Sequence, residues 1–196
     1  MRQKVIIIPL LLLTLIFSTS KMAAQNTSVG FKGGPALTGI SNLEGASGKL
    51  GGRVGGFITY SVSRSFGIGG EVNLVRKGFQ AGNGDHIHLD YVEVPLLAQF
   101  FVGRGGCRPK IIVGPYGAYL LQATADGEAL DAYQSQDYGA VLGAGFHQRV
   151  GGRKWLYFDV RYGYGIAEVQ ERMDYANRDI SVSIGLSFPL DNWMDL

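Results

Sequence analysis

One short segment of the sequence carries side chains that could bind a metal ion, Asp85-His86-Ile87-His88-Leu89-Asp90. In an extended strand alternate side chains share a face, so His86, His88 and Asp90 would point the same way. Imidazole and carboxylate groups are ligands of zinc and copper. The segment lies at the edge of an expected loop, where polar residues are ordinary. We therefore expect no metal site and keep these three residues only as candidates.

Motifs for other chemistry are missing from the sequence. There is no Gly-x-Gly-x-x-Gly segment opening a helix, no phosphate-binding loop and no His-Glu-x-x-His. His147, serines and aspartates are present, but no motif places a nucleophile beside a base. Cys107 is the single cysteine, which excludes an internal disulfide and a cysteine-based zinc site. The sequence predicts a protein that is not an enzyme and has no cofactor.

The clearest structural element is the segment 179–188 near the C-terminus. Its side chains alternate strictly, with five apolar residues on one face and serine or glycine on the other. The apolar residues are Ile180, Val182, Ile184, Leu186 and Phe188. Similar alternation recurs about eight times along the chain. Apolar residues outside and polar residues inside are typical of a transmembrane β-barrel.

Eight strands follow from this pattern, and their connections alternate in length. We expect the strands at 27–37, 50–62, 65–78, 88–102, 108–121, 137–150, 154–167 and 178–190. Three connections are short, at Ser63-Arg64, at 103–107 and at 151–153, and the other four are longer and polar. Short turns at one end and long loops at the other fit an outer-membrane barrel with both termini in the periplasm. The predicted fold is an all-β, eight-stranded, antiparallel, up-and-down transmembrane β-barrel.

The polar faces of these strands predict a lumen filled with charge. Charges facing hydrocarbon are costly, so they should point inward and pair with one another. The expected lumen charge network comprises Lys32, Arg53, Glu71, Lys77, Glu93, Arg149, Asp159 and Arg161. An eight-stranded barrel is just wide enough for such side chains to fill it, which argues against an open pore. A proton or ion path through the lumen is the alternative to simple structural pairing.

Aromatic residues recur on the apolar faces beside the short turns. Aromatic rings prefer the membrane–water interface. We expect a periplasmic aromatic girdle formed by Tyr60, Phe66, Phe100, Phe146, Phe158 and Phe188.

The N-terminus predicts a cleaved signal peptide over residues 1–24. Arg2 and Lys4 precede an apolar run from Val5 to Phe17, which is shorter than the roughly 20 residues of a membrane-spanning helix. A retained anchor is the alternative. Cleavage leaves fifteen basic residues against sixteen acidic ones in a single domain, 25–196. The basic pI of the full chain therefore gives no reason to expect a nucleic-acid partner.

Several motifs of the mature chain resemble the PorT-like outer-membrane β-barrel family, an outer membrane protein beta-barrel domain common in Bacteroidetes. The most specific is Tyr91-Val92-Glu93-Val94-Pro95-Leu96-Leu97, and Gly114-Pro115-Tyr116, Asp159-Val160-Arg161-Tyr162 and Arg76-Lys77-Gly78 also fit. The resemblance implies a small closed barrel in the outer membrane of a Gram-negative cell, without one assigned activity. Its founding type supports protein secretion. The chain departs from the usual aromatic C-terminus, because residues 189–196 follow Phe188.

Together these observations predict a structural or interaction role in the cell envelope. The expected partners are outer-membrane lipid, the barrel-assembly machinery during insertion, and an envelope or secretion protein. The alternatives are a secretion-machine component, a narrow porin-like passive pore, and a soluble lipocalin-like binding barrel.

Overall fold

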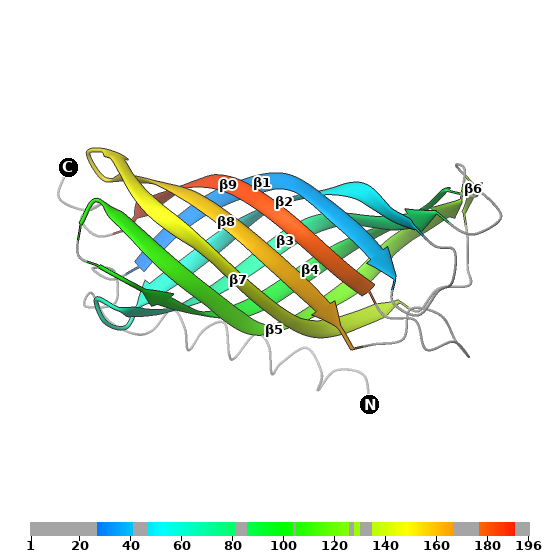
Figure 1. Cartoon of the computed structure of the whole chain (residues 1–196), viewed down its shortest axis with the longest axis horizontal. Helices are drawn as coiled ribbons and strands as arrows, with labels where there is room; N and C mark the ends of the chain where they lie inside the picture. The colour runs from blue at the N-terminus through cyan, green and yellow to red at the C-terminus, as the bar shows by residue number, and fades with distance from the viewer. Residues whose placement is uncertain are drawn as a thin grey trace, which may run out of the picture.

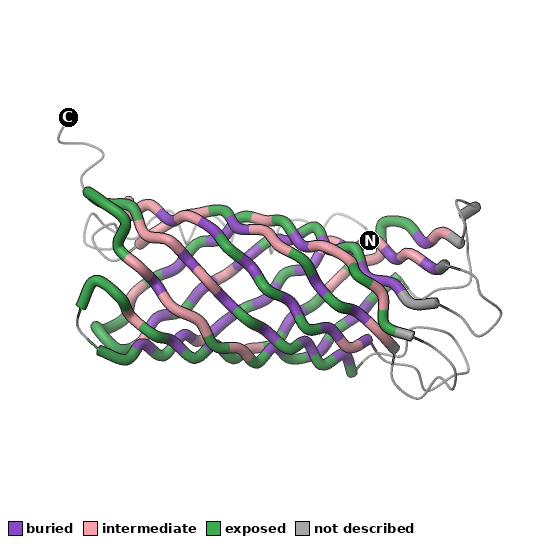
Figure 2. The backbone as a smooth tube through the Cα atoms, turned by 45° about the horizontal axis from the view of Figure 1, so that its top comes forward, coloured by how far each residue is buried: buried purple, intermediate pink, exposed green. Residues whose placement is uncertain are grey.

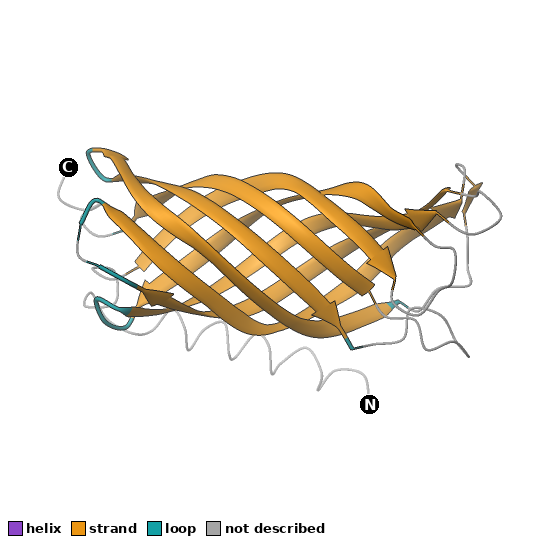
Figure 3. Ribbon diagram, viewed as in Figure 1, coloured by secondary structure: helices purple, strands orange, loops and turns teal. Residues whose placement is uncertain are grey.

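The structure, a computed structural model, is all strand and turn in its described part (Figure 3). It describes residues 27–40, 47–80, 86–103, 105–125, 128–129, 135–166 and 177–190. The expected signal peptide over 1–24 and most of the expected long loops lie outside these residues. In the described part of the chain, no helix is long and apolar enough to cross a membrane.

Eight long strands form the wall of the barrel, and a ninth strand of two residues lies beyond it. The strands are β1 (Thr27–Ile40), β2 (Ser47–Ser61), β3 (Phe66–Gln80), β4 (His86–Phe101), β5 (Cys107–Ala125), β6 (Glu128–Ala129), β7 (Gln136–Gly151), β8 (Lys154–Gly165) and β9 (Asn177–Pro189). They are labelled in Figure 1.

Every pairing between neighbouring strands is antiparallel, and the sheet closes on itself. Strand β1 pairs with both β2 and β9, and β4 pairs with both β3 and β5. Consecutive long strands are therefore neighbours all the way round, and the first and last strands meet. This is the eight-stranded up-and-down barrel that the alternation predicted. A closed wall leaves no edge strand, and all its backbone groups can be satisfied within lipid.

The two ends of the barrel differ in the way that the sequence predicted. The connections β2–β3, β4–β5 and β7–β8 are short and lie together at one end, at the left of Figure 1. We call this the short-turn end, and the opposite one the long-loop end. Gly151 and Gly152 adopt positive φ in the β7–β8 turn, which glycine does without strain.

Side chains alternate between a buried interior and an exposed exterior along most of the wall, as the alternating colours of Figure 2 show. The exterior is apolar: Val54, Leu74, Leu96 and Ile184 are each half exposed or more. The interior combines a small apolar cluster, including Leu97, Ile112 and Val141, with many polar and charged side chains. This arrangement is the reverse of a soluble protein and suits a lipid environment.

Several strands extend further toward the long-loop end than the sequence indicated. Strand β1 continues to Ile40, β3 to Gln80 and β5 to Ala125, so that β5 has 19 residues. A tilted strand needs only about 9–11 residues to cross a bilayer. The extensions therefore rise above the membrane. The outer face is no longer required to be apolar there, and the apolar–polar alternation that marks a strand in the sequence fades. The two-residue strand β6, which pairs with the end of β5, was not predicted.

Candidate functional site

Among the residues that the structure describes, ten charged side chains are buried in the interior of the barrel, five basic and five acidic. Each has 5% or less of its surface exposed. They are Lys32, Arg53, Glu71, Lys77, Glu93, Lys110, Asp137, Asp159, Arg161 and Asp179. We call this set the lumen network. Its formal charges sum to zero.

Glu71 is the most connected member of the lumen network. Its two carboxylate oxygens accept hydrogen bonds from both terminal nitrogens of Arg161, at 2.9 and 3.0 Å. Lys32 Nζ donates to Oε1 at 2.8 Å, and Asn73 Nδ2 donates to Oε2 at 3.2 Å. Strands β1, β3 and β8 supply these side chains, so the contacts tie together parts of the wall that are not neighbours. A planar guanidinium on a carboxylate also fixes the geometry of the pair.

Asp159 is the second carboxylate of the same half of the lumen. Lys110 Nζ lies 2.8 Å from its Oδ1, and Arg161 donates to Oδ2 at 2.8 Å. Lys32 Nζ lies 4.0 Å from Oδ2. Three cations thus surround two carboxylates, Glu71 and Asp159, and this half carries one excess positive charge.

The other half of the lumen, toward the long-loop end, carries one excess negative charge. Glu93 lies between Arg53 NH1, at 3.0 Å, and Lys77 Nζ, at 3.6 Å. Arg53 NH2 also lies 3.5 Å from Asp179 Oδ2, and Lys77 Nζ lies 3.0 Å from Asp137 Oδ2. Two cations here face three carboxylates, which balances the first half.

Polar and aromatic neighbours complete the surroundings of Asp137 and Lys77. Asn177 Nδ2 donates to Asp137 Oδ2 at 2.8 Å, and the Tyr116 hydroxyl lies 3.4 Å from Oδ1. The ammonium of Lys77 lies 5.1 and 5.0 Å from the ring centroids of Tyr91 and Tyr116. A cation over an aromatic face is attracted by the ring's negative centre. The lumen is therefore filled by mutually engaged side chains.

The energetics of this arrangement favour closure over passage. An ion removed from water costs several kcal/mol in effective terms, and only well-placed partners offset that cost. Each of the ten charged groups has an opposite charge within 4.0 Å. An ion moving along the axis would have to break several of these contacts in succession. The network can hold the wall rigid and occlude the axis.

Seven of the eight charges expected in the lumen lie there, and one does not. Arg149 is exposed, and its guanidinium donates from Nε and NH2 to the carbonyl of Gly152, at 3.1 and 3.0 Å. The register of β7 against β8 shifts between Arg149 and Gly151. Arg149 itself still pairs with Trp155, which lines the cavity at this end, so it is exposed because it lies at the rim of the barrel, next to the turn. The expectation for Arg149 was wrong.

Three members of the lumen network were not predicted from the sequence: Lys110, Asp137 and Asp179. Lys110 shares its face of β5 with buried Ile112 and Tyr116, so this strand has no simple polar inner face. The two aspartates lie near expected strand boundaries, where loop residues and lumen residues look alike in sequence. In the structure β7 begins at Gln136 and β9 at Asn177, and both aspartates are buried inside the wall.

The six residues of the expected aromatic girdle all lie on the outer face beside the short turns. Phe66 and Phe100 are cross-strand partners with ring centroids 5.2 Å apart, and Phe146 and Phe158 form a similar pair at 5.3 Å. Phe188 packs against Phe31 at 6.4 Å. Tyr60, in β2, is exposed on the same face of the wall. Such rings sit well at the level of lipid headgroups.

The candidate metal residues are occupied by other partners where the structure describes them. Asp90 accepts hydrogen bonds from Arg76 Nε and NH2, at 2.7 and 2.8 Å. His88 Nε2 lies 2.9 Å from Lys49 Nζ. The side chain of His86 lies outside the described residues. No group of three or more potential metal ligands occurs among the side chains that the structure describes.

Solved structures of similar shape are small outer-membrane barrels. Neisserial surface protein A has a TM-score of 0.58 and 15% identity, over 83% of this chain and 96% of that one. OprG from Pseudomonas aeruginosa has a TM-score of 0.55 and 13% identity, over 84% of this chain and 96% of that one. AlkL in DMPC lipid bilayers has a TM-score of 0.55 and 17% identity, over 87% of this chain and 93% of that one. At these identities the likeness shows the fold alone. No curated protein sequence matches the chain significantly.

A family profile assigns most of the sequence. The profile described as "Outer membrane protein beta-barrel domain" matches residues 23–171. The matched part runs from β1 through β8, and thus covers most of the wall and most of the lumen network. The apolar exterior, the closed wall and the charged interior agree with this assignment. The chain belongs to the outer membrane protein beta-barrel domain family.

Proposed function

We propose that this protein is a sealed outer-membrane barrel with a non-enzymatic, structural or interaction role in the cell envelope. The observation that carries the proposal is the neutral lumen network, whose ten buried charges have opposite charges within reach. A closed axis leaves the apolar wall, which binds lipid, and the two ends, which can bind other molecules. Loops on a rigid scaffold commonly carry recognition. The barrel-assembly machinery is the expected partner during insertion.

Solute flux across vesicle membranes tests the sealed lumen. Proteoliposomes of the purified protein should swell in small sugars no faster than empty liposomes, whereas liposomes with a general porin should swell rapidly. The fraction of folded barrel in each preparation is measured by its faster gel migration when unheated. Swelling in proportion to the amount of folded protein would contradict the proposal and favour the passive pore.

The second candidate is a component of a protein-secretion machine, as the PorT-like resemblance implies. The motif that carries this resemblance most specifically lies in β4, where Tyr91, Glu93, Pro95 and Leu97 face the interior. Glu93 is engaged with two cations of the lumen network. These residues build the barrel, so the motif supports the fold more directly than it supports a secretion role.

Native-membrane experiments separate the two candidates. A secretion component should be recovered with other envelope proteins after cross-linking, and its deletion should reduce the amount of secreted protein in the medium. Normal secretion in a deletion strain, with the barrel recovered only as a monomer, would exclude this candidate. The soluble lipocalin-like alternative requires a polar exterior, and the apolar wall of this barrel argues against it.

A further inference from the structure

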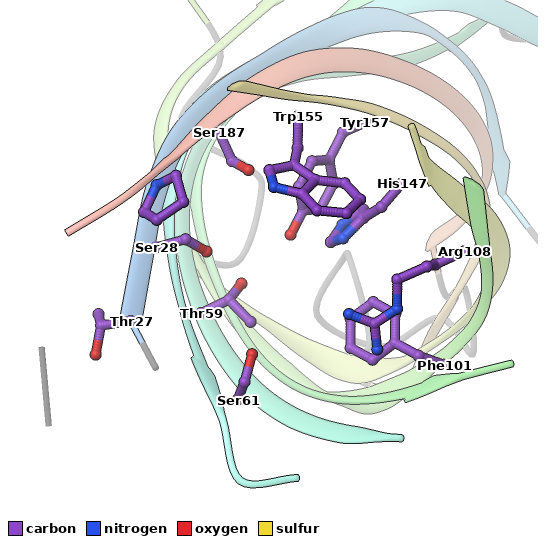
Figure 4. A pocket seen from close by; sticks show the side chains of 11 residues that line it. Thr27, Ser28, Thr59, Ser61, Phe101, Arg108, His147, Trp155, Tyr157 and Ser187 are labelled. Atoms are coloured by element: carbon purple, nitrogen blue, oxygen red, sulfur yellow. The ribbon is translucent and has the colours of Figure 1, made fainter. Parts of the chain in front are cut away.

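The barrel has a cavity at the short-turn end, which borders the lumen network at Lys110. Its volume is about 240 Å³, and Figure 4 shows the side chains that line it. Ser28, Thr59, Arg108, His147, Trp155 and Tyr157 are among them. These side chains project from the inner face of the wall toward the barrel axis. We call this cavity the vestibule.

Among the described residues at the short-turn end, the charged side chains are all basic. They are Arg64, Arg108, Arg149, Arg153 and Lys154. Within the described ranges 27–31, 57–68, 98–103, 105–112, 144–158 and 184–190 there is no aspartate or glutamate. A basic concavity with apolar walls concentrates anions from solution.

Arg108 is held in the vestibule without a carboxylate partner. Its guanidinium lies 4.6 Å from the ring centroid of Phe101, and it donates to the backbone carbonyl of Arg64. It forms no ion pair with any residue that the structure describes. The guanidinium is thus positioned by an aromatic face and one carbonyl, with other donors left over. Arginine presents five N–H groups in a fork that matches a carboxylate.

Tyr157 supplies a second donor at the base of the vestibule. The side chain is 3% exposed, and its hydroxyl lies beside Thr59 without a well-formed hydrogen bond to any described residue. The Thr59 hydroxyl already accepts a hydrogen bond from Gln99 Nε2 at 3.3 Å. A buried hydroxyl without a good partner is costly, and an entering acceptor removes that cost. Lys110, 3.9 Å from the Tyr157 ring centroid, adds positive charge below it.

We propose that the vestibule binds an acidic peptide segment of a periplasmic protein, with carboxylates held by Arg108 at the rim and by Tyr157 at the base. The direction of the side chains favours a peptide over a lipid headgroup. The lining residues face the axis, whereas the outer face at this level carries aromatic and apolar side chains such as Tyr60 and Phe100. A peptide in aqueous solution can enter along the barrel axis. Trp155 offers a flat apolar surface to the stems of its side chains.

The vestibule borders the lumen network at Lys110, but the two residues proposed to hold carboxylates, Arg108 and Tyr157, are not members of that network. Failure of this proposal would leave the proposed function intact. Conductance by the barrel would contradict the proposed function, and peptide binding to the vestibule would still be tested by the binding experiment alone.

Peptide binding to the folded protein tests the proposal. The full barrel, purified from outer membranes, is placed in phosphatidylcholine nanodiscs and titrated into a fluorescein-labelled hexaglutamate peptide, with hexaglutamine as the control probe. Fluorescence anisotropy should show saturable binding of hexaglutamate only. Arg108→Gln should weaken it about tenfold or more, as expected for the loss of one charge-assisted contact. Lys154→Gln, a matched loss of one charge at the start of β8, should change it less than about twofold.

Three results would overturn the proposal. Equal weakening by Arg108→Gln and Lys154→Gln would mean diffuse attraction to a basic end. Loss of peptide binding when phosphatidylglycerol replaces phosphatidylcholine would mean that lipid headgroups occupy the site. The third applies even where Arg108→Gln does not fold: Tyr157→Phe keeps the ring and the fold, and unchanged affinity in this variant would exclude the vestibule. We expect Tyr157→Phe to weaken binding about threefold or more.

Discussion

Replacing Glu71 by glutamine tests the lumen network at its most connected carboxylate. The glutamate oxygens contact Lys32 at 2.8 Å and the two terminal nitrogens of Arg161 at 2.9 and 3.0 Å. Glutamine has nearly the same shape but no charge. After the change, three buried cations, Lys32, Lys110 and Arg161, face Asp159 alone. The variant thus removes charge with little change in packing.

The expected cost follows from the burial of these groups. Removing one partner of a buried ion pair costs about 3–5 kcal/mol, because the remaining charge is left uncompensated away from water. We expect Glu71→Gln to lower the free energy of unfolding by this amount. With a urea slope of about 2 kcal/mol per molar, the unfolding midpoint falls by roughly 2 M. The measurement is reversible urea unfolding in lipid vesicles, followed by tryptophan fluorescence and by gel mobility.

A matched control comes from the outer face of the same protein. Arg76 and Asp90 form a bidentate pair of similar geometry, at 2.7 and 2.8 Å, but their side chains are 61% and 31% exposed. Exposed pairs contribute about 0–1 kcal/mol, so Asp90→Asn should shift the midpoint little. Equal and small effects of Glu71→Gln and Asp90→Asn would refute the reasoning, because they would mean that water screens the lumen charges.

Three further predictions use other parts of the barrel. Glu93→Ala leaves two buried cations without their shared carboxylate and should cost about 3–5 kcal/mol, read from thermal unfolding in detergent; an unchanged midpoint would contradict this. Gly114→Ala places a methyl group against a backbone carbonyl of β4 and should cost about 1–3 kcal/mol, whereas Gly117→Ala in the same strand meets open space and should be neutral; similar urea midpoints would count against this close approach of β4 and β5. Cys107 is exposed at the short-turn end, so a polyethylene-glycol maleimide should label it only after the outer membrane is permeabilised, and labelling of intact cells would reverse the topology.

The strand pattern made the fold predictable, because lipid outside and charge inside impose opposite demands on alternate residues. Strand β9 shows this most clearly: Ile180, Val182 and Ile184 are exposed, while Ser181 and Ser183 are buried. The same logic placed Glu71 and Arg161 in the lumen. The alternation is a weaker guide where the two faces of a strand no longer have opposite requirements. Beyond the lipid the outer face need not be apolar, so the ends of β1, β3 and β5 carry no clear strand signal.

The partners within the lumen could not be read from the sequence. Lys32 and Glu71 are 39 residues apart and Arg53 and Asp179 are 126 apart, and only the closed register brings each pair together. The exposure of Arg149 likewise follows from its place at the rim beside the β7–β8 turn, which the alternation does not reveal. The vestibule was missed for a related reason. Its lining residues come from strands all round the wall, and no two of them form a motif.

Single-channel recording in planar lipid bilayers tests the central claim, a barrel closed by its own charges. Folded wild-type protein should give no steady conductance above the bare membrane across the accessible voltage range. A general porin, inserted in the same bilayer, provides the positive control for detection. Steady, stepwise current from the wild-type barrel, in proportion to the folded protein added, would contradict the account of a neutral network that occludes the lumen.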